Sequence, residues 1–196
     1  MSIAGARTRD AVRLDDDWRF RDGVVGNAHE RLLDDRGWQT VQLPHDAAVG
    51  RAFDTAGSTS ANGWLPHGAG AYRKHFALPA DAAHRRVLVE FEGVYRDAQV
   101  WINGHYLGRH LNGYIGFEHD LTEHVVCGGD NVLTVTYDNR KAHTSRWYTG
   151  EGLFRDVARK QLHFALVKGE IDPDVPVPVR VHLPSCVRDY FAIERP

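Results

Sequence analysis

Cysteine is scarce in this sequence, which has only Cys127 and Cys186 among its 196 residues. Two cysteines do not make the disulfide framework on which small secreted domains depend. Residues 1–14 also contain no apolar run of the length that a signal peptide needs. We therefore expect a cytoplasmic protein, in which a disulfide between the two cysteines is disfavoured.

Long hydrophobic runs and an excess of charge of one sign are also missing. No segment approaches the ~20 apolar residues of a membrane-spanning helix, so no membrane partner is expected. The formal net charge of −2 gives no electrostatic reason to expect nucleic acid as a partner. What remains is the composition of an ordinary globular protein, with enough length for one domain plus a fragment.

Metal-binding motifs are absent, although the sequence has 12 histidines. The densest set matches neither H-E-x-x-H nor another compact metal motif, and no CxxC pair is present. We interpret these histidines as polar side chains of strands and loops, and the sequence predicts no metal and no other cofactor. The set comprises His105, His110, His119 and His124.

Alternation of apolar and polar residues, the pattern of a half-buried strand, is abundant. In segment 86–93, for example, Val87, Val89 and Phe91 share one face of the predicted strand. Short strands of this kind, with almost no helix between them, predict an all-β sandwich. The predicted strands are residues 71–79, 86–93, 98–104 and 131–139.

Turns and helices are predicted at a few positions between these strands. Asn103-Gly104 predicts a tight hairpin, because both residues readily take positive φ angles. Residues 127–131 predict another turn. Residues 28–35 predict two helical turns, and residues 122–126 predict one turn capped by Thr122.

Two long segments, residues 43–70 and 138–157, interrupt the strand pattern. Loops of this length inside a compact domain are usually functional or disordered. The second contains SRWYTGEGLFRDV (145–157), which places an arginine and two aromatic residues beside a pair of glycines. By contrast, Trp18, Trp38 and Trp101 fit strand or core positions, and we assign them to packing.

Several motifs occur in an order that resembles one known family. Together they resemble the N-terminal jelly-roll, or galactose-binding-like, sugar-binding domain of glycoside hydrolase family 2, which includes β-galactosidases and β-glucuronidases. The resemblance assigns residues 13–157 to that β-sandwich. The motifs are LDDDWRF (14–20), LPHDA (43–47), GAGAYRKHF (68–76), VLVEFEGVYRDAQVWINGHYLGRHLNGYIGFEHDLT (87–122), NVLTVTYDN (131–139) and SRWYTGEGLFRDV (145–157).

The resemblance implies a domain that has no catalytic residues of its own. In the family, an immunoglobulin-like domain and a (β/α)8 barrel follow the sandwich, and the barrel holds the two catalytic glutamates. Neither domain is present in these residues. Glu90, Glu92 and Glu118 lie in or beside predicted strands, so we do not assign them as the catalytic pair.

The same resemblance places LPHD and SRWYTGEG near the border of the sugar pocket. The predicted substrate-binding residues are Asp46, Arg146, Trp147 and Tyr148. A carboxylate and a guanidinium bond sugar hydroxyls, and an aromatic face covers the C–H face of a sugar ring. Structural roles remain open: the aromatic residues would pack between domains, Arg146 would pair with Asp138, and Asp46 would cap a turn.

A second resemblance begins after residue 157. Residues 161–189 resemble the start of the GTP cyclohydrolase II-like domain of bifunctional riboflavin-biosynthesis proteins. Ser185 aligns best with the first zinc-binding cysteine of that family, and Cys186 lies one place off. We therefore predict that residues 158–196 are a short foreign extension without a zinc or GTP site, which docks on the sandwich or stays disordered.

Three hypotheses for function follow. The first is a non-catalytic sugar-binding fragment of a family 2 hydrolase whose substrates are β-galactosides or β-glucuronides. The second is a complementing subunit that assembles in trans with a separate catalytic barrel. The third is a remnant that joins a glycosidase gene to a riboflavin-biosynthesis gene and has no selected role.

Overall fold

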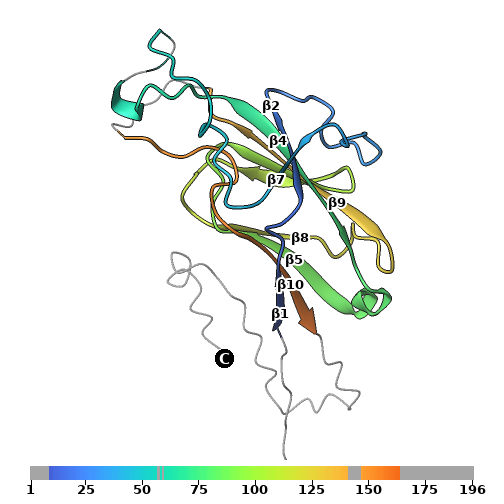
Figure 1. The fold of residues 1–196 in the computed structure, drawn as a ribbon. Coiled ribbons are helices and arrows are strands. Elements are labelled where there is room, and N and C mark those ends of the chain that lie inside the picture. The colour runs from blue at the N-terminus through green and yellow to red at the C-terminus, as the bar shows by residue number, and fades with distance from the viewer. Residues whose placement is uncertain (1–8, 57, 59, 141–146, 164–196) are drawn as a thin grey trace, which may run out of the picture. The chain divides into compact units, whose positions relative to one another are not determined.

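A computed structural model describes residues 9–56, 58, 60–140 and 147–163. Within them, two antiparallel sheets face each other and enclose one hydrophobic core (Figure 1). The predicted all-β sandwich is therefore confirmed. No helix in the described ranges is long and apolar enough to cross a membrane.

The two sheets differ in size and in the order of their strands. The smaller has the order β1 (Arg9–Arg13), β10 (Val157–His163), β5 (Arg85–Phe91) and β8 (Phe117–Asp120). The larger has the order β3 (Gln39–Val41), β2 (Trp18–Asp22), β4 (Ala69–Ala77), β9 (Asp130–Asp138), β6 (Ala98–Ile102) and β7 (His105–His110). Two short 3-10 helices are η1 (Ser60–Asn62) and η2 (Ala80–His84).

The core forms where the apolar faces of the two sheets meet. Val87, Val89 and Phe91 of β5 are completely buried, which confirms the face predicted for this strand. From the other sheet, Leu133 and Val135 of β9 enter the same cluster. Removing these side chains from water supplies about 1.5–3 kcal/mol each.

The predicted hairpin joins β6 to β7. Asn103 and Gly104 have φ angles of 51° and 89°, as a tight hairpin turn requires. The Asn103 amide also donates to the His124 carbonyl and to Asn131 Oδ1, both at 2.8 Å, and its oxygen accepts from the Val132 amide at 2.9 Å. Asn103 therefore links the hairpin to the next turn of the sheet.

The helix predicted for residues 28–35 is wrong. These residues form turns, and their carbonyl groups are satisfied by a side chain from the sheet. The completely buried Arg73 guanidinium donates to the carbonyls of Ala28, Glu30 and Arg31, and it pairs with Asp35 at 2.7 Å. A long-range cation thus replaces the local hydrogen bonds that a helix would have made.

The predicted turn at residues 122–126 is also capped differently. The Leu121 carbonyl accepts from the amides of His124 and Val125, and the Asp120 side chain accepts from the Thr122 amide at 3.0 Å. The Thr122 hydroxyl instead accepts from the Val87 amide at 3.0 Å. Asp120 is therefore the capping residue, because Thr122 is used to tie the turn to β5.

The strands reach beyond the predicted range of 13–157 at both ends, since β1 begins at Arg9 and β10 ends at His163. β10 lies between β1 and β5 and is antiparallel to both. Residues 158–163 are therefore part of an interior strand. The rest of the predicted extension, residues 164–196, lies outside the described residues.

Arg159 of β10 occupies an inward-facing position. It lies two residues after Val157, which is buried in the core, so the two side chains share a face of the strand. Its Nε and Nη1 atoms are buried and have no hydrogen-bond partner in the described part of the chain. Burial, with a contribution from Arg85, lowers the pKa of Arg159.

We expect Arg159→Leu to raise the free energy of unfolding by about 1–2 kcal/mol, because it removes buried unsatisfied donors. Lys160→Leu is the matched control, since Lys160 pairs with Glu90 at 2.6 Å. It should give no gain. Urea unfolding measures both, and a destabilised Arg159→Leu protein would contradict the prediction.

Arg73→Ala should destabilise the domain by about 3–5 kcal/mol, because three carbonyls lose their donor and the buried Asp35 carboxylate keeps only His75 as a partner. Arg86→Ala breaks the Arg86–Asp120 pair, whose side chains are 46% and 41% exposed, and should cost less than about 1 kcal/mol. The midpoint of urea unfolding distinguishes the two. Similar midpoints would show that Arg73 does not hold the turns together.

Candidate functional site at the meeting of two loops

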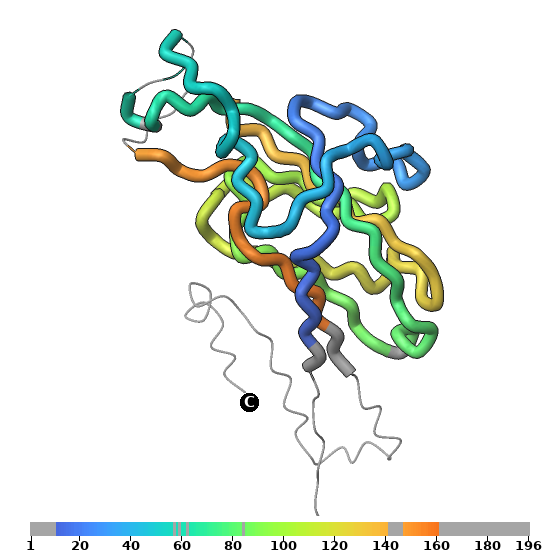
Figure 2. The backbone as a smooth tube through the Cα atoms, in the orientation of Figure 1, coloured from blue at the N-terminus to red at the C-terminus, as the bar shows by residue number. Residues whose placement is uncertain are grey.

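The two long segments predicted from the sequence meet at one end of the sandwich (Figure 2). The His45 amide donates to the Leu153 carbonyl at 2.8 Å, and the Ala47 amide donates to the Glu151 carbonyl at 3.0 Å. On the other side, Tyr95 and Gly152 exchange hydrogen bonds in both directions. Residues 151–153 are therefore held between two neighbouring backbone segments.

The glycine pair in SRWYTGEG allows this close packing. Gly150 and Gly152 have φ angles of 78° and 81°, which residues with a Cβ atom rarely adopt. A Cβ atom at Gly152 would also overlap the Tyr72 hydroxyl. The glycines therefore let the segment turn tightly against the core and direct Glu151 inward.

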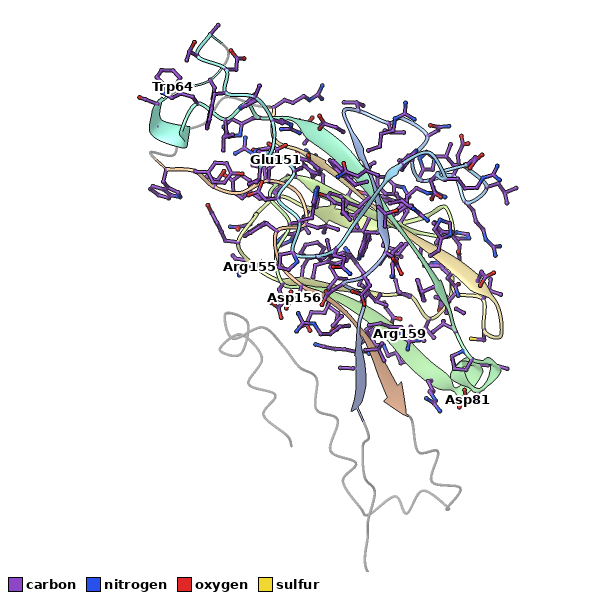
Figure 3. All side chains as sticks on the ribbon, viewed as in Figure 1. Trp64, Asp81, Glu151, Arg155, Asp156 and Arg159 are labelled. Carbon is purple, nitrogen blue, oxygen red and sulfur yellow. The ribbon has the colours of Figure 1, made fainter. Side chains whose placement is uncertain are left out.

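Glu151, which is labelled in Figure 3, is completely buried and accepts hydrogen bonds from four residues. Its Oε1 atom accepts from Arg51 Nη1 at 2.7 Å and from the Tyr137 hydroxyl at 3.0 Å. Its Oε2 atom accepts from the Gly68 amide at 3.0 Å and from Asn139 Nδ2 at 3.1 Å. We call these five residues the Glu151 cluster.

Arg51 carries the cationic side of the cluster. Besides Glu151, it donates to Asp22 Oδ1 at 2.5 Å and to the Pro66 carbonyl at 3.1 Å. Burial lowers the pKa of Arg51, but the charges of Glu151 and Asp22 raise it by more, so it lies above the ordinary value. The guanidinium stays charged and joins the long loop to β2.

Two of the predicted substrate-binding residues contact each other beside this cluster. The Tyr148 hydroxyl donates to Asp46 Oδ1 at 2.5 Å, although the residues are 102 positions apart. Burial raises the pKa of Tyr148, and its hydrogen bond to Asp46 raises it further, so the phenol remains a donor. Asp46 Oδ1 also accepts from the Ala48 amide at 3.1 Å, which is the turn-capping role left open by the sequence.

The other two predicted residues are placed differently. The Trp147 side chain is 61% exposed, directly before Tyr148 in the chain. Arg146 and its expected alternative pairing with Asp138 lie outside the described residues. Asp138 accepts two hydrogen bonds from the Arg140 side chain and one from the Arg140 amide. The structure thus brings Asp46, Tyr148 and Trp147 to the same end of the sandwich.

His45, next to Asp46, faces the core. Its Nδ1 atom lies 2.8 Å from the Tyr72 hydroxyl. Burial lowers the pKa of His45, and Asp46 only partly offsets this effect. The imidazole therefore stays neutral near neutral pH and positions the segment that carries Asp46.

This arrangement is suited to binding. Because Glu151 has no exposed surface and its oxygens are engaged by four donors, it is a structural carboxylate. Asp46, Tyr148 and Trp147 offer an acceptor, a phenol and an aromatic surface, which are the groups that contact sugars. Across the described residues, no group of three or more His, Cys, Asp or Glu side chains could hold a metal ion.

The Glu151 cluster is not predicted by the sequence motifs. The only local signal was a glutamate between two glycines in the last motif. Nothing in that signal indicates that Glu151 is buried, because its partner Arg51 is 100 positions away in the sequence and lies in the long loop. The long-range pairing of Glu151 with Arg51 could be found only from the fold.

Comparison with known proteins agrees with this geometry. The family model described as "Glycosyl hydrolases family 2, sugar binding domain" matches residues 55–162. The chain belongs to that family. The resemblance to glycoside hydrolase family 2 that the sequence motifs indicated is therefore confirmed.

Individual relatives of this family 2 domain are glycosidases. It is 40% identical over 142 residues to the β-galactosidase BoGH2A of Bacteroides ovatus, a match covering 72% of this chain and 17% of the relative. It is 32% identical to a β-glucuronidase of Formosa agariphila, covering 72% of this chain and 16% of the relative. The crystal structure of a β-glycosidase from Bacteroides vulgatus is 37% identical, with a TM-score of 0.74, covering 78% of this chain and 20% of that one.

The family 2 domain therefore spans about a fifth or less of the length of these relatives. A second family model, described as "GTP cyclohydrolase II", matches residues 142–196 and overlaps the first over residues 142–162. This agrees with the second resemblance noted in the sequence. The overlap includes residues 157–162 of β10, which form part of the sandwich.

Glu151→Gln should lower the free energy of unfolding by about 3 kcal/mol, because the charge that balances Arg51 is lost and an amide group faces donors. Glu118→Gln is the control, since the Glu118 side chain is 41% exposed and lies 3.5 Å from Lys160. It should cost less than about 1 kcal/mol. Urea unfolding followed by circular dichroism measures both, and equal losses would contradict a central role for Glu151.

Proposed function

We propose that this chain is the non-catalytic sugar-binding part of a family 2 glycosidase that hydrolyses β-galactosides or β-glucuronides. The observation that carries the proposal is the contact between Asp46 and Tyr148, beside the exposed Trp147. The names of the relatives support the substrate class, since they include both β-galactosidases and β-glucuronidases.

The chemistry of this end suits the edge of a sugar pocket. Asp46 Oδ1 accepts from Tyr148 and Ala48, and its second oxygen is the one we assign to a sugar hydroxyl. The Trp147 ring would cover the C–H face of the sugar. Arg146, the preceding residue in the chain, would bond a hydroxyl or carboxylate of the same sugar.

We assign catalysis to a separate barrel domain that contacts this end of the sandwich. The matched region is 17% of one of these relatives and 20% of the other, which leaves room in them for such a domain. Large apolar side chains at this end support the contact, because exposed apolar groups gathered in one place mark interaction sites. They are Val49, Phe53, Trp64 and Trp147, and Figure 3 shows Trp64 on the outlying part of the long loop.

A second candidate is a complementing subunit that binds a barrel encoded separately. One observation favours it: the chain is 34% identical over 86 residues to a protein of Lactobacillus acidophilus named "Beta-galactosidase large subunit". That name describes a relative whose chain is one part of an assembly. The cytoplasmic location expected from the sequence stays a prediction for either candidate.

The test is a chimera in which residues 9–163 replace the aligned region of the Bacteroides ovatus relative. We expect the chimera to hydrolyse a nitrophenyl β-galactoside or β-glucuronide and the chain alone to hydrolyse neither. Asp46→Ala in the chimera should lower kcat/KM about tenfold to a hundredfold, because it removes a charged acceptor from the sugar. The same chain mixed with the remaining barrel part tests the second candidate.

Asp54→Ala is the matched control for this experiment. Asp54 makes the same kind of turn, since its Oδ1 atom accepts from the Ala56 amide at 2.9 Å, but it does not bond Tyr148. Its kcat/KM should match that of the unsubstituted chimera. A folded chimera without activity, or an Asp46→Ala chimera as active as the Asp54→Ala one, would overturn the proposal.

A further inference from the structure

A groove crosses the outer face of the six-stranded sheet, and neither Asp46 nor Tyr148 lines it. One part is a hollow of about 320 Å³ between residues 24–29 and strand β6, with the ends of β4 and β9 as its floor. A second hollow of about 240 Å³ is lined by Arg51 and His67. The two share Val24, Ala69 and Arg140 in their walls, so they are adjacent and form one groove that leads toward the Glu151 cluster.

Trp101 supplies the aromatic surface of this groove. Its neighbours on β6, Val100 and Ile102, are completely buried, whereas Trp101 is only partly buried and points to the outer face. The His29 ring stacks on it with a centroid separation of 5.7 Å, and Tyr106 packs against it at 5.5 Å. The strand position predicted for Trp101 is correct, but the side chain lines a groove.

The outer layer that forms one wall of the groove is held firmly. Ala28, Trp38 and Ala71 make a small second core between the 24–38 segment and the sheet. The Thr134 hydroxyl contacts the Ala28 carbonyl within this layer. Because the Arg73 guanidinium also bonds this segment, the wall is fixed without any ligand.

Polar side chains line the rest of the groove at matched positions. Gln99 of β6 lies directly opposite Thr136 of β9 in the strand register, so an amide and a hydroxyl sit side by side. Asp97 is held by Arg109 at 2.6 Å. Asp138 likewise forms an ion pair with Arg140 at 2.7 Å. Sugar-binding sites combine such groups: paired charges and neutral polar side chains bond the hydroxyls, and an aromatic ring covers the C–H face.

We propose that this groove binds one pyranose residue of an oligosaccharide or polysaccharide, packed against Trp101 and the His29 ring that stacks on it. The volume beside Trp101 holds a single sugar ring, and the polar walls match its hydroxyls. The inference rests on the proposed function, because the groove continues to the Arg51 side of the Glu151 cluster. The substrate class that fits is therefore a polymeric glycan, one residue of which is held away from the cleaved bond.

The test uses the full 196-residue chain with uniform ¹⁵N labelling. Its five tryptophans give five indole N–H resonances, and Trp101→Phe identifies the one from Trp101. The probes are β-1,4-galactotetraose and a glucuronate-containing hyaluronan tetrasaccharide. We expect at least one probe to shift the Trp101 resonance with a dissociation constant on the order of 1 mM.

Substitutions distinguish binding in this groove from binding at the Asp46–Tyr148 contact. Trp101→Ala should weaken the binding about tenfold, the loss expected for one aromatic stack, while Trp101→Phe should retain most of it. Gln99→Ala tests the polar wall without disturbing the aromatic ring. Leu32→Ala is the control, because Leu32 is 94% exposed and does not line the groove.

Each result decides the inference. Weakened binding in Trp101→Ala and Gln99→Ala, with Leu32→Ala unchanged, supports it. If neither probe moves the Trp101 resonance at about 10 mM sugar, the groove is not a glycan site and the inference fails. Binding that is unaffected by Trp101→Ala but lost in Asp46→Ala also overturns the inference, while it leaves intact the function proposed for Asp46 and Tyr148.

Discussion

The pairing of the buried Glu151 carboxylate with Arg51 is the interaction on which the functional end of this domain depends. A charge removed from water is costly unless it is paired and fully hydrogen-bonded, and Glu151 meets both conditions. Its four donors come from the long loop, from β9 and from the residue that follows β9. Satisfying this one carboxylate therefore fixes the loops that carry Asp46 and Tyr148.

The same principle operates on the other side of the six-stranded sheet. Arg73 is completely buried, and its guanidinium bonds the carbonyls of a segment without regular secondary structure. In both places a charged side chain fixes a segment that has no regular secondary structure. Arg73 extends from β4 to residues 28–31, and Glu151 binds Arg51 of the long loop. Loops held in this way keep a fixed shape, which is what a binding surface needs if it is not to lose affinity by ordering on contact.

Features governed by neighbours in sequence could be predicted, and features governed by distant partners could not. The alternation of Val87, Val89 and Phe91 and the Asn103-Gly104 turn are local, and both were correct. Residues 28–35 looked helical because nothing near them reveals Arg73. Asp46 and Tyr148 were assigned to one border by family resemblance, but no local pattern predicts the hydrogen bond between them.

The position of β10 has a consequence for synthesis of the chain. Among the strands in the described residues, β10 comes last in sequence and β1 first, yet β10 lies between β1 and β5. During translation β1 leaves the ribosome early and has no partner in its sheet until β10 follows. The small sheet is therefore completed last, and an emerging chain exposes strand edges to other chains until residue 163 is available.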